Sequence, residues 1–192
     1  MIAVFLFALA TLPAYAHFQA LLPDPPIVES PENRTVTFDI RFTHPMEGGP
    51  VMDMETPVRA GVLVGGETED LRESLVLRPI DDKKAYSLEY AVKKPGDHIF
   101  FLEPAPYWEP AEGKMIIHYT KVVVNAYGDE SGWDAAVGLP VEIEPLVRPY
   151  GLWAGNLFRG IAKRDGKPIP YAEVEVEYWN SAGKITPPTE AH

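Results

Sequence analysis

Three histidines, His17, His44 and His118, are the side chains of this sequence best suited to hold a transition metal. His17 directly follows the tripeptide AYA (residues 14–16), the small-x-small pattern that signal peptidase recognises. Cleavage after this tripeptide would free the amino group of His17, with a pKa of about 8, to chelate one ion together with the imidazole Nδ1. Nitrogen ligands in tetragonal geometry suit Cu(II) or Ni(II). The alternative is that a histidine follows the cleavage site by chance.

The other two histidines continue apolar patterns typical of strands. In TVTFDIRFTH (residues 35–44) apolar residues alternate with polar ones, and His44 extends the apolar side. His118 lies in KMIIHYTKVVV (residues 114–124) and also shares the apolar side there. Both side chains are therefore predicted to point inward, either as metal ligands or as hydrogen-bonded core residues.

A methionine-rich segment follows His44 directly. In THPMEGGPVMDMETP (residues 43–57), Met46, Met52 and Met54 are interspersed with carboxylates. Thioethers favour Cu(I), whereas carboxylates suit harder ions. The segment is therefore predicted to cover or tune the histidine site, and the alternative is that its methionines are apolar plugs at the end of a sandwich.

The remaining features favour binding over catalysis. His98 in PGDHIFF lies beside a turn and is expected to be partly exposed rather than a ligand. The proline-rich run FLEPAPYWEPAEG (residues 101–113) is predicted to be a loop that shapes a site or contacts a partner. There is no nucleophile elbow, no His-Glu-x-x-His and no phosphate-binding glycine loop, so no enzyme is predicted.

Composition narrows the classes of partner and metal ligand. The chain carries 17 basic and 28 acidic side chains, a net charge of −11, which argues against nucleic acid as a partner. There is no cysteine, so a metal must bind histidine, carboxylate, methionine or backbone groups.

The start of the chain predicts export. The apolar run at residues 1–12 is shorter than the roughly 20 residues that span a bilayer. We therefore expect residues 1–16 to be a cleaved signal peptide and the protein to be periplasmic. No later run is long and apolar enough for an anchor, so the mature chain is predicted not to span a membrane.

The pattern of short alternating segments predicts an all-β fold. Prolines and glycines separate the pieces, and no long helical period survives between them. We expect an Ig-like antiparallel β-sandwich at residues 17–147, followed at 148–192 by the beginning of a second, incomplete sandwich. Asp165-Gly166 between two strand-like runs predicts a hairpin in the second unit. The further strand candidates are VRAGVLV (58–64), ESLVLRP (73–79), KAYSLEYAV (84–92) and DHIFFLE (97–103).

Four segments resemble the DUF4198 family, described as periplasmic components of nickel/cobalt uptake transporters. They are HFQALLP, THPMEGGPVMDMETP, FLEPAPYWEPAEGKMIIHYTKVVVNAYG and RPYGLWAGNLFRGIAKRDGKPIPYAEVEVEYWN. The resemblance implies a protein that handles Ni(II) or Co(II) beside membrane subunits of an energy-coupling-factor-type importer, with His17, His44 and His118 as its binding residues. It also implies that family members continue beyond His192.

Chemistry alone leaves other functions open. Cu(II) binds nitrogen sites more tightly than Ni(II), so a periplasmic copper carrier is an alternative. A further alternative is an oxidative copper enzyme that uses an N-terminal histidine brace, although no substrate platform is recognisable in the sequence. The last alternative is a metal-free interaction module that presents the PAPYWEP loop to a partner.

Overall fold

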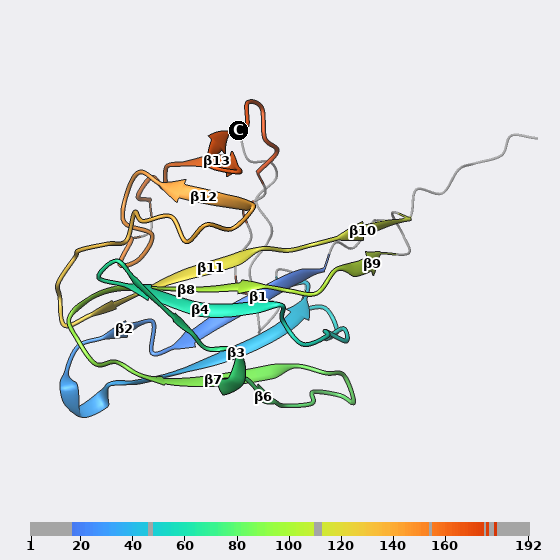
Figure 1. Ribbon diagram of the computed structural model, residues 1–192, viewed down its shortest axis with the longest axis horizontal. Coiled ribbons are helices and arrows are strands. Elements are labelled where there is room, and N and C mark those ends of the chain that lie inside the picture. The colour runs from blue at the N-terminus through green and yellow to red at the C-terminus, as the bar shows by residue number, and fades with distance from the viewer. Residues whose placement is uncertain are drawn as a thin grey trace, which may run out of the picture.

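Two sheets form the body of the protein, antiparallel except for the parallel pair β2–β11, and the predicted β-sandwich is confirmed (Figure 1). The computed structural model describes residues 17–45, 48–109, 113–153, 155–174, 176 and 179. The first sheet has the order β1 (Phe18–Asp24), β3 (Thr35–Thr43), β7 (Tyr86–Ala91), β6 (Val76–Leu77). The second has the order β2 (Ile27–Val28), β11 (Thr120–Ala126), β8 (Gly96–Glu103), β4 (Arg59–Val64), β5 (Glu67–Asp70). Two short 3-10 helices, η1 (Pro31–Asn33) and η2 (Arg72–Ser74), lie in the connections.

The core lies between the sheets and follows from the period-two pattern. In β3 the residues Val36, Phe38, Ile40 and Phe42 are buried, while the first threonines of the strand face solvent. Phe38 packs on Phe100 of β8 with 4.3 Å between the ring centroids. Each such side chain contributes about 1.5–3 kcal/mol by leaving water, so this alternation fixes which face of β3 is inside.

The central strand of the second sheet, β8, differs from a half-buried strand because all of its residues except Glu103 are buried. His98 is 0% exposed and its ring packs against Tyr90 and Phe100. The expectation that His98 is partly exposed is therefore wrong. The turn beside it is covered, since the amide of Asp97 donates to the carbonyl of Ser131.

The segment at residues 114–124 is two strands rather than one. β10 (Lys114–Ile116) pairs with β9 (Tyr107–Glu109) in a hairpin that extends from the sandwich (Figure 1), and β11 begins at Thr120. His118 therefore lies in the break between β10 and β11. Part of the proline-rich run is consequently a strand, whereas the prediction treated the whole run as a loop.

A third sheet, of order β12 (Val141–Pro145), β13 (Gly160–Arg164), β14 (Lys167–Pro168), follows the sandwich. Asp165 and Gly166 join β13 to β14 with φ values of 49° and 73°, so the predicted hairpin is confirmed. β12 pairs with β13, which places residues 141–145 in this sheet, although the sequence assigned them to the first unit. The end of the chain, from residue 180, lies outside the described residues, so an incomplete second sandwich stays a prediction.

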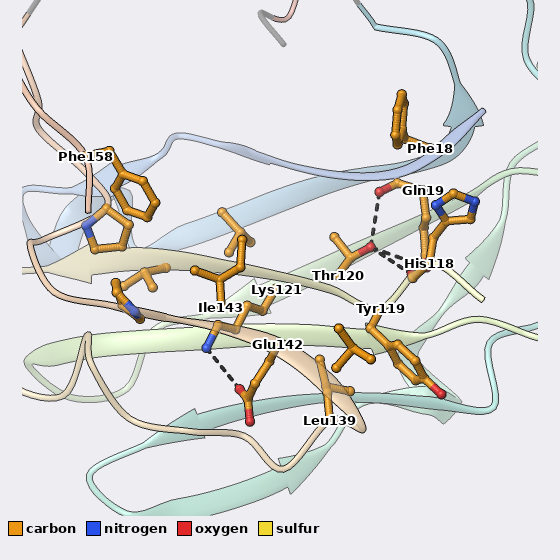
Figure 2. A pocket seen from close by; sticks show the side chains of 15 residues that line it. Phe18, Gln19, His118, Tyr119, Thr120, Lys121, Leu139, Glu142, Ile143 and Phe158 are labelled. Carbon is orange, nitrogen blue, oxygen red and sulfur yellow. Dashed lines mark hydrogen bonds and ion pairs between the residues drawn. The ribbon is translucent and has the colours of Figure 1, made fainter. Parts of the chain in front are cut away.

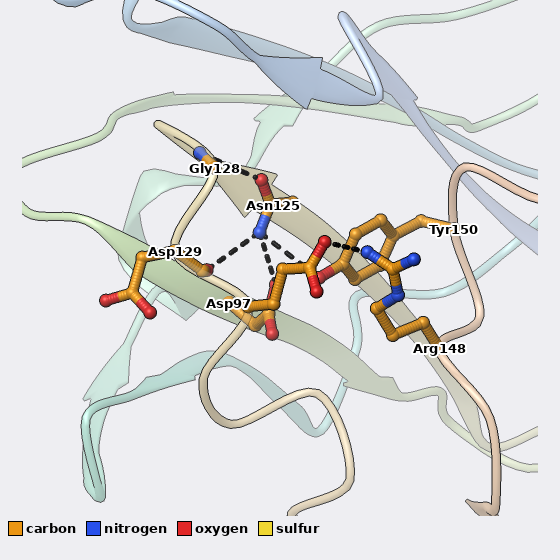
Figure 3. A network of polar contacts seen from close by, with 7 residues as sticks. Asp97, Asn125, Gly128, Asp129, Arg148 and Tyr150 are labelled. Atoms are coloured by element: carbon orange, nitrogen blue, oxygen red, sulfur yellow. Dashed lines mark hydrogen bonds and ion pairs between the residues drawn. The ribbon is translucent and has the colours of Figure 1, made fainter.

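A buried polar network links the sandwich to the connection between β12 and β13 of the third sheet (Figure 3). The side-chain amide of Asn125 donates to Asp97 Oδ1 at 2.8 Å, to the carbonyl of Asp129 at 2.8 Å and to the hydroxyl of Tyr150 at 3.2 Å. Burial, followed by the nearby Asp97 carboxylate, raises the pKa of Tyr150 to about 12. The phenol is therefore neutral at physiological pH. It connects the segment between β12 and β13 to Asp97 of β8 and Asn125 of β11.

Within the described part of the chain, no helix is long and apolar enough to cross a membrane.

Candidate metal centre

His17 and His44 occupy facing positions at one end of the first sheet. The ladder between β1 and β3 runs antiparallel, and its last pair is Phe18 with Thr43. One step further places His17 opposite His44. Gln19, two residues after His17, pairs with Phe42, two residues before His44, and both side chains are buried. Because side chains alternate between faces, the two histidines share the inner face of the sheet.

His118 reaches the same end of the sandwich from the second sheet. Its ring centroid lies 5.9 Å from that of Phe18 and 5.9 Å from that of Phe42. The ring of His44 lies 5.7 Å from the same Phe18. Figure 2 shows Phe18 and His118 at one end of this region, with Thr120 beside them. The start of β1, the end of β3 and the approach to β11 therefore place the three histidines at the same end of the sandwich.

A carboxylate that the sequence did not single out joins them. Glu109, at the end of β9, is 5% exposed, and its Oε2 lies 3.9 Å from His17 Nδ1. Burial first, and then the charge of Glu109, raise the pKa of Tyr107 on the same strand. A glutamate in a proline-rich run carries no sequence signal for burial, and the pairing of β9 with β10 is what turns it inward.

The histidine cluster does not form a closed coordination shell. Among the described residues, no three His, Asp or Glu side chains converge closely enough to hold a metal ion. The main-chain nitrogen of His17 could add a ligand only as a free amine, because it is an amide while Ala16 is attached. The predicted amine–imidazole chelate requires the cleaved chain.

The methionines of residues 43–57 have different environments. Met54 is 1% exposed and belongs to the hydrophobic core, which favours the packing interpretation for this residue. Met52 forms an isolated bridge with Phe42, its amide donating to the Phe42 carbonyl at 2.9 Å, and packs partly buried against the core. Its bridge partner Phe42 lies two residues before His44 in the chain. Met46 lies outside the described residues.

His98 is not part of this cluster. Its Nδ1 lies 3.1 Å from the carbonyl of Gly96, while its Nε2 has no hydrogen-bond partner among the described residues. Burial lowers the pKa of His98, so the ring is held neutral inside the core.

The fold and this end of the molecule define a β-sandwich protein with three histidines and a buried glutamate gathered where β1 begins. The chain belongs to the DUF4198 family, whose description is "domain of unknown function" and whose profile matches residues 14–192. The predicted family is therefore confirmed. No curated protein and no solved structure matches the chain.

Proposed function

We propose that the mature protein is a periplasmic metal-binding accessory protein that captures or delivers Ni(II) or Co(II) for an uptake transporter. The observation that carries this proposal is the facing register of His17 and His44, with His118 against the same Phe18. Signal-peptide cleavage would add the His17 amine at this end of the sandwich. The proposed ligands are this amine and the imidazoles of His17, His44 and His118, whose side chains would have to move to meet on one ion.

The charge around the site supports a cation as the cargo. The buried carboxylate of Glu109 lies beside His17, and the chain as a whole carries a net charge of −11. A metal ion competes with protons for amine and imidazole nitrogens, so binding should release protons and weaken as the pH falls.

The choice of nickel or cobalt rests on the resemblance to transporter-associated proteins. A copper carrier is the second candidate, because the nitrogen ligands favour Cu(II) and Met52 bridges Phe42, which lies two residues before His44. Its cargo would be Cu(II) at the histidines or Cu(I) at the thioether of Met52. A metal-free interaction module is the third candidate and predicts no tight binding of any of these ions.

Calorimetric titration with Ni(II), Co(II) and Cu(II) tests the proposal on a chain that begins at His17. We expect micromolar or tighter binding that is lost in His17→Ala and retained in the matched control His192→Ala. Tighter binding of Cu(II) is expected from ligand chemistry alone, so the transporter assignment also requires tight Ni(II) or Co(II) binding. Cu(I) binding that is lost in Met52→Leu would favour the copper carrier. Affinities weaker than millimolar for all of these ions would contradict both metal-binding candidates and favour the metal-free interaction module.

A further inference from the structure

A cavity of about 440 Å³ lies between β11 of the sandwich and β12 of the third sheet (Figure 2). It opens to solvent, and one end of its wall is His118. Most of the wall is apolar. The apolar side chains that define its shape are Phe18, Val123, Leu139, Val141, Ile143 and Phe158. The volume falls within the range of about 300–1,000 Å³ that is usual for small-molecule sites.

The charged groups of the wall neutralise each other. Lys121 Nζ lies 3.0 Å from Glu142 Oε2, and both side chains are largely buried. Glu142 also accepts the backbone N–H groups of Val137 and Gly138, each at 3.2 Å. An anionic ligand would have to displace Glu142 from Lys121, which would leave a buried carboxylate without its cation. The wall therefore disfavours a charged ligand.

We propose that this cavity binds a small, neutral, mostly apolar organic molecule. The apolar walls supply the affinity, and the Lys121–Glu142 pair disfavours a charged ligand. This site requires neither the amine of His17 nor a metal ion, so it is separate from the proposed function.

The test uses prodan, a neutral naphthalene with one ketone oxygen, whose fluorescence moves to shorter wavelength in apolar surroundings. We expect the chain beginning at His17 to bind one prodan with a Kd of about 10 µM or tighter. Anilinonaphthalene sulfonate, an anionic naphthalene, should bind at least about tenfold more weakly, because of the Lys121–Glu142 pair.

One variant locates the probe. Val141→Trp fills the cavity from its exposed edge and should abolish binding. The control is Leu77→Trp, in a separate groove beside Arg72 and Tyr86, which should leave binding unchanged.

Prodan binding that is unchanged in Val141→Trp would overturn the proposal, as would no detectable binding or a preference for the sulfonate. The outcome is distinct from that of the metal titration. His17→Ala should leave prodan binding intact, and Val141→Trp should leave Ni(II) binding intact.

Discussion

His17 and His44 lie opposite each other one position beyond the last pair of the β1–β3 ladder, Phe18 with Thr43. Their side chains are on the inner face of the sheet, at an end that the strands leave open. Strands therefore position two of the three histidines, and a register change of one residue in β1 would turn His17 to the outer face, away from His44.

The first prediction concerns the two imidazoles that complete the proposed site. His44→Ala and His118→Ala should each weaken Ni(II) binding at least about tenfold, because each removes a nitrogen ligand. Calorimetry on the chain that begins at His17 measures the effect. His192→Ala is the control for loss of a histidine elsewhere. Full affinity in both site variants would restrict the site to His17.

The second prediction concerns the buried carboxylate. Glu109→Gln keeps the shape but removes the negative charge 3.9 Å from His17 Nδ1, and Ni(II) affinity should fall about tenfold. Glu69→Gln on β5, where the carboxylate pairs with Lys93, removes an equal charge from a different strand and should have no effect. Equal losses in the two variants would mean that net charge alone is responsible.

The third prediction separates core packing from metal ligation at Met54. Met54→Ala should lower the free energy of unfolding by about 2–5 kcal/mol, because it opens a cavity in the core. Met54→Leu conserves volume and should cost less than about 1.5 kcal/mol. Denaturant unfolding gives both values. Unchanged Ni(II) and Cu(I) affinity in Met54→Leu is expected, and a loss of either would make Met54 a ligand.

The fourth prediction is a pH dependence of stability that originates at His98. Its pKa is lowered in the folded protein, so the unfolded chain binds a proton more readily below the ordinary value of about 6.5. Stability is therefore complete above about pH 6.5. It falls as the pH drops toward the lowered folded-state pKa, by at most about 1.4 kcal/mol per pH unit.

His98→Leu should flatten this fall, since leucine carries no proton in either state. Urea unfolding of both proteins between pH 7 and pH 5 measures the difference in slope. Parallel curves would show that other groups account for the pH dependence.

Much of the fold was predictable from local pattern, because alternation reports which face of a strand is buried. The buried face of β3, the position of His44 at its end and the Asp165-Gly166 hairpin all follow from short stretches of sequence. The pairing of β1 with β3 was not predictable, since it depends on residues far apart in the chain. The facing arrangement of His17 and His44 comes only from that register.

Two residues show where pattern fails. His98 stands beside a turn, a position usually exposed, yet β8 is the central strand and its turn is covered by the segment around Ser131. Glu109 is buried because β9 and β10 form a hairpin inside a run whose prolines predict a loop. In both cases tertiary contacts override the local signal.

The central claim is that a free His17 amine takes part in metal binding. The most direct measurement compares Ni(II) affinity of a chain that begins at His17 with one that retains Ala16 and is otherwise identical. The proposed chelate predicts a loss of about 100-fold or more in the longer chain, since its His17 nitrogen is an amide. Equal affinities in the two chains would contradict the account.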